Sequence, residues 1–184
     1  MIILGIDPGT ARMGWGIIKS KVPARGGSAF GGKSQKSKLM DVKKLNGNVE
    51  LLGYGCVVTD KEDGVGKRLT VLRKELRQLL KTHKPEIMAV ERLFFGMNAK
   101  TAIAVGQATG VILLTASELH VPVVEYTGLQ VKLRVAGHGR ADKKVVQTQI
   151  RRIFGIDNLS FKGKKKGWDD ASDALAIAIC HILK

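Results

Sequence analysis

Acidic residues, cysteines and long apolar runs are all scarce in this chain of 184 residues. The two cysteines, Cys56 and Cys180, lie far apart among apolar neighbours, so we expect reduced core thiols in an intracellular protein. No apolar run reaches the roughly 18 residues of a membrane-spanning helix. The N-terminal segment also lacks a basic leader followed by a cleavage site. We therefore expect a cytoplasmic protein with no membrane partner.

The shortage of acids leaves a strong positive charge. The chain has 31 Lys and Arg against 16 Asp and Glu, and its formal net charge is +15. A basic intracellular protein most often meets a polyanion, above all nucleic acid. Seven basic residues and one aspartate in segment 20–48 account for +6 of this charge. The remaining +9 is spread over the rest of the chain.

The length and the order of sequence patterns predict one α/β domain over residues 1–184. Three β-type segments, at 2–6, 14–18 and 49–59, come first and predict an antiparallel meander. Segment 20–48, between the second and third of them, is rich in Gly and Lys and has no periodicity. We expect it to be a flexible basic loop inserted at about 20–48.

Helical and strand patterns alternate in the rest of the chain. A leucine stripe over 69–80 predicts a helix, and a buried strand over 87–90 ends at Glu91. Further patterns predict a helix at 99–119, a strand at 121–126, and helices at about 141–154 and 169–183. The expected architecture is α/β, a mixed five-stranded sheet with three antiparallel leading strands flanked by helices.

Four carboxylates occupy positions where active sites form in α/β proteins. Asp7 ends the first strand and Glu91 the fourth, while Asp170 and Asp173 lie on one face of the last helix, in its first predicted turn. Clustered carboxylates repel one another unless a cation lies among them. In a protein of charge +15, their convergence predicts a site for Mg²⁺ or Mn²⁺, hard cations that also bind phosphate.

Each carboxylate has a simpler explanation when it is taken alone. Asp7, before Pro8, could begin an Asx-type turn, and Glu91 could be a solvated strand end. Asp170 and Asp173 could be acids that a helix dipole favours near the helix N-terminus. Their shared placement and the basic charge of the chain favour the common metal site.

Three longer motifs occur in a fixed order. The first motif is residues 3–10 (ILGIDPGT), followed closely by Gly14-Trp15-Gly16. The second is residues 90–94 (VERLF), and the third is residues 170–178 (DASDALAIA). Together they resemble the RuvC Holliday-junction resolvases of the RNase H-like superfamily, over nearly the whole chain except segment 20–48. The first motif alone also resembles the start of sugar kinases and heat-shock-type ATPases, whereas the third motif with Glu91 is specific.

The resemblance implies an RNase H-like fold and an endonuclease that resolves four-way DNA junctions in recombination and repair. It implies four catalytic residues that hold two Mg²⁺ ions per subunit, with Mn²⁺ able to substitute: Asp7, Glu91, Asp170 and Asp173. It also implies four DNA-binding residues: Lys132, Lys143, Phe94 and Arg140. The lysines would lie near the scissile phosphate and the phenylalanine would stack on unpaired bases. A solvated lysine or a core phenylalanine is the simpler alternative for these.

The resemblance also implies a mechanism and partners. Two metal ions would activate water and stabilise charge on the attacking and leaving oxygens, as in other two-metal nucleases. Symmetric cleavage of two strands needs two active sites related by a two-fold axis, so we expect a homodimer. The usual partner of the family is a RuvA–RuvB branch-migration complex. Segment 20–48 departs from the family pattern, and we hypothesise that it is a basic arm adding non-specific DNA affinity.

Two alternatives remain open from the sequence. One is a YqgF-type nuclease, which shares the G-I-D-x-G opening, and the other is a non-catalytic basic DNA-binding module with structural acids. A sugar-kinase-like ATPase would need a second lobe, for which 184 residues leave no room.

Overall fold

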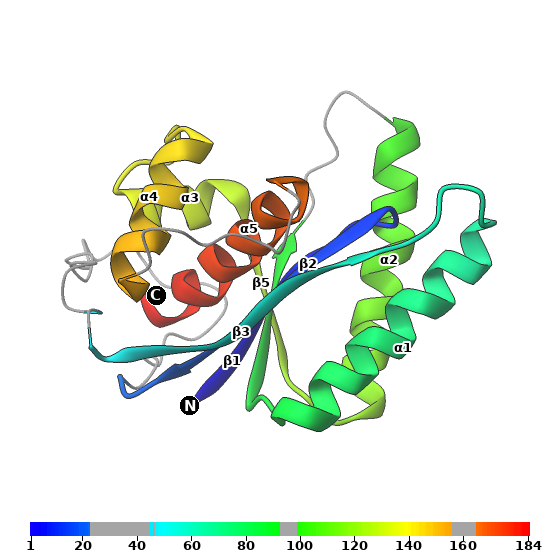
Figure 1. Cartoon of the computed structure of the whole chain (residues 1–184), viewed down its shortest axis with the longest axis horizontal. Coiled ribbons are helices and arrows are strands. Elements are labelled where there is room, and N and C mark those ends of the chain that lie inside the picture. The colour runs from blue at the N-terminus through cyan, green and yellow to red at the C-terminus, as the bar shows by residue number, and fades with distance from the viewer. Residues whose placement is uncertain (23–44, 46, 93–98, 156–164) are drawn as a thin grey trace, which may run out of the picture.

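The protein, represented by a computed structural model, forms one five-stranded sheet with helices on both faces (Figure 1). The structure describes residues 1–22, 45, 47–92, 99–155 and 165–184. In chain order the elements are β1 (Ile2–Asp7), β2 (Arg12–Ser20), β3 (Val49–Val58), α1 (Val65–His83), β4 (Ile87–Arg92), α2 (Ala99–Glu118), β5 (Val123–Thr127), α3 (Gly128–Ala136), α4 (Lys143–Phe154) and α5 (Lys165–Ile182).

The sheet is mixed, with the strand order β3-β2-β1-β4-β5. β2 pairs antiparallel with β1 and with β3, whereas β1, β4 and β5 are parallel neighbours. The expected sheet, with three antiparallel leading strands, is therefore confirmed. Because β1, β4 and β5 run in the same direction, their C-terminal ends meet at one edge of the sheet.

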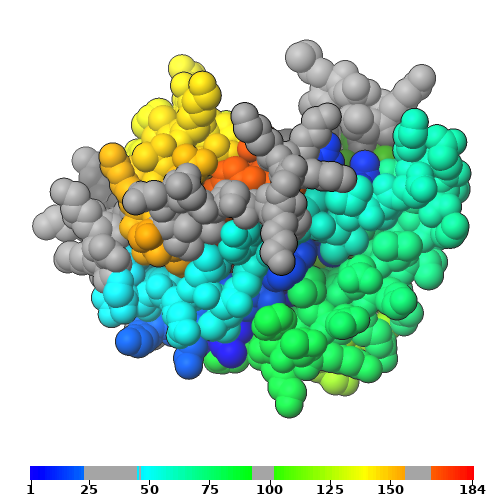
Figure 2. Space-filling view, viewed as in Figure 1, coloured from blue at the N-terminus to red at the C-terminus, as the bar shows by residue number. Residues whose placement is uncertain are grey.

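The two faces of the sheet carry different layers of helices (Figure 1). Side chains alternate along β1, so that Ile3 faces the layer of α3, α4 and α5 while Leu4 and Ile6 face α1 and α2. Viewed in space-filling form, the yellow lobe of α3 and α4 stands on one side of the strands and the green α1 on the other (Figure 2).

Helix α5 lies deep in the molecule between the sheet and the α3–α4 layer, and it is apolar on nearly all sides. It approaches β1 and β2 closely because glycines face it. A Cβ atom at Gly5 would overlap the carbonyl oxygen of Ala174, and one at Gly14 would overlap the carbonyl oxygen of Asp170. Backbone thus packs directly on backbone, which places the Asp170–Ala174 segment over the ends of β1 and β2.

Two expectations about helices are corrected by the structure. Helix α5 begins at Lys165 instead of about 169, so Asp170 and Asp173 lie beyond its first turn. Helix α3 was not expected from the sequence, because only Val131 and Val135 of its nine residues are buried and they make no long stripe. Its signal was the capping box, in which Thr127 and Gln130 each satisfy the other's backbone N–H.

Most of the predicted loop at 20–48 lies outside the described residues, so its insertion and flexibility stay predictions. At its base, the Lys21 backbone N–H donates to the Asn48 carbonyl at 2.9 Å, which joins the ends of β2 and β3. None of the helices in the described part of the chain combines the length and apolarity that crossing a bilayer requires.

Candidate active site

Asp7 and Glu91 are brought together by the parallel pairing of β1 with β4. Ile6 pairs with Val90 in the register, and both side chains face α1 and α2. The next residue on each strand therefore points to the opposite face, towards α5. Asp7 and Glu91 consequently lie side by side at the C-terminal edge of the sheet.

Asp170 and Asp173 reach the same edge from above, on α5. The backbone of Asp170 rests on Gly14, which pairs with Asp7 across β1 and β2. Asp173 lies three residues further along, so it projects from the same helical face. Both carboxylates are partly open to solvent, with 26% of the Asp170 side chain and 32% of the Asp173 side chain exposed.

Three of these acids, Asp7, Glu91 and Asp173, have a pKa above the ordinary value of a carboxyl group. Burial and then the negative charges of Glu91, Asp173 and Asp170 raise the pKa of Asp7 to about 8. Burial followed by the charge of Asp173 raises the pKa of Glu91. Burial also raises the pKa of Asp173, although the adjacent Lys143 opposes this effect. Groups that make each other costly to ionise are the ones that a bound cation would stabilise.

Two basic side chains already contact the acids of α5. The ammonium Nζ of Lys143, the first residue of α4, lies 2.7 Å from Asp173 Oδ2. The guanidinium Nη1 of Arg12, the first residue of β2, lies 3.3 Å from Asp170 Oδ2. The thiol of Cys56 donates to that same oxygen at 3.6 Å. Burial, followed by the charge of Asp170, raises the pKa of Cys56 to about 12, so this thiol stays protonated.

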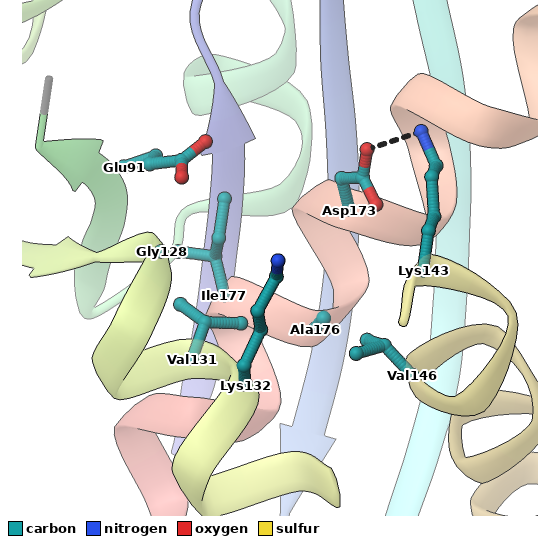
Figure 3. Close-up of a pocket in the computed structure, with 9 residues that line it drawn as sticks. All are labelled: Glu91, Gly128, Val131, Lys132, Lys143, Val146, Asp173, Ala176 and Ile177. Carbon is teal, nitrogen blue, oxygen red and sulfur yellow. Dashed lines mark hydrogen bonds and ion pairs between the residues drawn. The ribbon is translucent and has the colours of Figure 1, made fainter. Parts of the chain in front are cut away.

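The acids line two neighbouring cavities. The first contains Glu91 and Asp173 with Lys132 and Lys143, above a floor that includes Val131 and Ile177. In Figure 3, Glu91 extends from β4 and Lys132 from α3 toward the middle of the cavity, whereas Asp173 and Lys143 point toward each other at its other side. Apolar and charged side chains thus line the same cavity.

The second cavity, of about 540 Å³, lies between the β1–β2 turn, α2 and α5. Asp7, Asp170 and Arg12 line it, together with Asp169. Lys143 lines both cavities, so they adjoin at this side chain. The first cavity thus combines one acid from a strand end with one acid from α5, and the second combines one acid from a strand end with two acids from α5.

The remaining predicted residues are placed differently. Arg140 is exposed in the turn between α3 and α4 and lines neither cavity. Phe94 lies outside the described residues. Sequence reasoning missed two residues that contact Asp170, namely Arg12 and Cys56. Arg12 lies just after the first motif, but no motif or spacing pattern assigns it a role. Only the crossing of α5 over β2 and β3 connects these residues with Asp170.

The carboxylates suit magnesium as donors. Within the described residues, no three His, Cys, Asp or Glu side chains are spaced so that they could enclose a metal ion. That spacing is compatible with Mg²⁺, which usually binds through one or two carboxylates plus water and substrate phosphate instead of a complete protein cage. The mutual effect of Glu91, Asp173 and Asp170 on the pKa of Asp7 is the observation that favours a cation here.

A family model described as "Crossover junction endodeoxyribonuclease RuvC" matches residues 32–181, most of the chain. The chain belongs to the RuvC family. The resemblance inferred from the three motifs is thereby confirmed.

Individual RuvC proteins match along the whole chain. The RuvC of Syntrophomonas wolfei is 41% identical over 182 residues, which are 99% of this chain and 88% of that protein. The RuvC of Desulfitobacterium hafniense is 42% identical over 181 residues, covering 98% and 92%. Thermus thermophilus RuvC, solved in complex with a Holliday junction substrate, has a TM-score of 0.76 at 31% identity and covers 100% of this chain and 93% of its own. The expected RNase H-like fold is confirmed by this likeness.

Proposed function

We propose that this protein is a structure-selective endonuclease that resolves four-way (Holliday) DNA junctions by metal-dependent hydrolysis at symmetric positions. The observation that carries the proposal is the meeting of Asp7, Glu91, Asp170 and Asp173 at one edge of the sheet. An acidic site within a chain of net charge +15 suits a reaction on a polyanion that needs cations at the reacting phosphate. Membership of the RuvC family supports this reading over a YqgF-type nuclease or a non-catalytic module.

The four carboxylates would hold two Mg²⁺ ions per subunit, and Mn²⁺ would substitute. Two ions are supported by the two adjoining cavities, one with Glu91 and Asp173 and the other with Asp7 and Asp170. Bound ions of this kind lower the pKa of water and stabilise charge on the attacking and leaving oxygens of a phosphodiester. The protein's own role would be to hold the carboxylates on two strands and one helix, at one edge of the sheet.

Lys132 and Lys143 would neutralise the charge that develops on the scissile phosphate. Both line the cavity that holds Glu91 and Asp173, and Lys132 reaches it from the second turn of α3. Arg140, exposed between α3 and α4, would contact the DNA backbone away from the reaction centre. Stacking by Phe94 on unpaired bases also belongs to this proposal, together with action in the cytoplasm.

We propose a homodimer, since symmetric cleavage needs two sites related by a two-fold axis. Helix α2 supports this, because an exposed stripe of small and apolar residues runs along it at helical spacing: Ile103, Gly106, Gly110, Leu113 and Leu114. Ile103 is 65% exposed and Leu114 55%, and such a patch is characteristic of a contact surface. A RuvA–RuvB branch-migration complex is the further partner that we propose.

A cleavage assay on a synthetic four-way junction tests the proposal. We expect the wild-type protein to cut in Mg²⁺ at symmetric positions and the Asp7→Asn variant to lose cutting. Junction binding by this variant should be unchanged or tighter, because a negative charge next to the phosphate has been removed. An Asp7→Asn protein that cuts as well as wild type would refute the catalytic assignment. Loss of binding together with cutting would point to misfolding, which circular dichroism would detect.

A further inference from the structure

Arg12 is a charged residue of the site to which the family motifs give no role. It begins β2, directly after the turn that follows Asp7. Its side chain lines the second cavity with Asp7, Asp170 and Lys143, and 38% of it is exposed. The guanidinium therefore lies at the surface, in an open cavity next to two of the acids, and not in the core.

Two side chains from other elements contact the same carboxylate oxygen of Asp170. Arg12 Nη1 lies 3.3 Å from Asp170 Oδ2, and Cys56 Sγ lies 3.6 Å from the same atom. In the proposed site a divalent ion binds this carboxylate. The Arg12 guanidinium, 3.3 Å from Oδ2, competes with the ion for that oxygen and also repels the ion through its positive charge. Binding of metal by Asp170 and pairing of Asp170 with Arg12 therefore oppose each other.

The charge at the two cavities indicates what happens next. Five carboxylates line them (Asp7, Glu91, Asp169, Asp170 and Asp173) against three basic side chains (Arg12, Lys132 and Lys143), a formal net charge of −2. A phosphate is therefore repelled while the site holds no divalent ion. Two such ions would reverse the sign to +2, and the basic side chains would then face an anion instead of the carboxylates.

We propose that Arg12 is a further DNA contact of this protein, a phosphate-binding residue that is released from Asp170 by divalent metal and then binds the sugar–phosphate backbone next to the scissile position. The inference rests on the proposed function. The guanidinium suits this role because its planar fork binds phosphate as readily as carboxylate. Lys132 lines the first cavity, Lys143 both and Arg12 the second, so a strand crossing the site meets the three in turn.

A structural ion pair is the competing explanation, in which Arg12 only orients Asp170. It predicts that Arg12 stays on Asp170 whether metal is bound or not. The two explanations differ in one measurable property, namely whether Arg12 adds a phosphate contact only in the presence of divalent metal.

The test measures junction affinity against salt concentration for the full-length protein, once in EDTA and once in Ca²⁺, with the DNA checked for integrity on a gel. Arg12→Gln removes the charge and Arg12→Lys keeps it. Lys81→Gln is the matched control, since Lys81 is exposed near the end of α1, where the chain leads back to the opposite edge of the sheet. In Ca²⁺, we expect Arg12→Gln to reduce the slope of log K against log salt by about 0.9, the value for one phosphate. In EDTA, its slope should equal that of wild type.

A second measurement uses Mn²⁺ without DNA, followed by electron paramagnetic resonance. Arg12→Gln should bind Mn²⁺ roughly tenfold more tightly than wild type, because a neighbouring cation no longer competes. Arg12→Lys should retain the wild-type salt slope in Ca²⁺, and it keeps the test valid if the glutamine variant folds poorly. Lys81→Gln should change neither the Mn²⁺ affinity nor the difference between EDTA and Ca²⁺.

Two outcomes would overturn the inference. An equal loss of slope in EDTA and Ca²⁺ would make Arg12 a permanent surface contact, and no loss in either would leave a structural ion pair. Failure of the proposed function gives a different result, because the wild-type protein would then neither cut the junction nor bind Mn²⁺.

Discussion

The acids at the strand ends and the acids of α5 form one site but lie in different surroundings. Asp7 and Glu91 are held by the sheet, and neither forms an ion pair with any other described residue. Asp170 and Asp173 each contact a basic side chain from another element. Without metal, the negative charges of the strand acids therefore have no adjacent positive charge among the described residues, whereas each helix acid is paired with a basic side chain. Metal should relieve the first pair and displace the cations of the second.

The largest expected effect comes from neutralising a strand acid. Glu91→Gln should lower single-turnover cleavage of a four-way junction by about 10³-fold or more, since a ligand of the metal is lost at the reacting phosphate. Glu50→Gln is a suitable control, because Glu50 is exposed on β3. Cleavage by Glu91→Gln within tenfold of the control would contradict the comparison.

The pH dependence of stability should show most directly that Asp7, a strand acid, differs from the helix acids. The folded-state pKa of Asp7 is raised from 3.8 to about 8, so its contribution to folding is favourable below pH 4 and is lost as the pH rises to about 8. In EDTA, Asp7→Asn should therefore become more stable than wild type as the pH increases, by up to a few kcal/mol. Urea unfolding between pH 4 and pH 9 measures this difference, and excess Mg²⁺ should reverse it. A difference that does not change with pH would contradict the burial of Asp7.

The spacing between the two pairs can be altered through Gly14. A Cβ atom there would overlap the backbone of Asp170, so Gly14→Ala must displace α5 from β2. We expect a loss of about 1–3 kcal/mol in the free energy of unfolding and a marked fall in cleavage. Gly66→Ala is the matched control, because no atom lies within 4 Å of a Cβ at that helical position. It should be neutral or slightly stabilising. Equal effects of the two variants would show that α5 does not depend on the close approach.

The smallest effect should come from the thiol beside Asp170. Cys56→Ala removes one weak donor from Asp170 Oδ2, and Arg12 still contacts that oxygen. We expect cleavage to fall by only about two- to threefold, with recovery in Cys56→Ser, which keeps a donor. A loss above tenfold in Cys56→Ala that serine restores would show that the thiol, and not Arg12, holds Asp170.

Sequence reasoning proposed the four carboxylates of the candidate site but not the residues around them. The four carboxylates could be predicted because strand ends and a D-x-x-D spacing are local patterns, and parallel strands bring their ends together. Arg12 and Asp170 are 158 positions apart, and no local pattern connects them. Helix α3, which carries Lys132, has too few buried residues for a periodicity signal, although its capping box could have predicted where it starts.

The contact of α5 with Gly5 and Gly14 has a consequence for how the protein tolerates change. Main-chain atoms on both sides set the height of this helix above the sheet, so the distance between the strand acids and the helix acids is set there by backbone contact and not by the size of a side chain. A change in the volume of a buried residue such as Ile179 should therefore alter the distance between these acids less than a side chain at Gly14 would. Gly5 and Gly14 thus determine how closely α5 approaches the sheet.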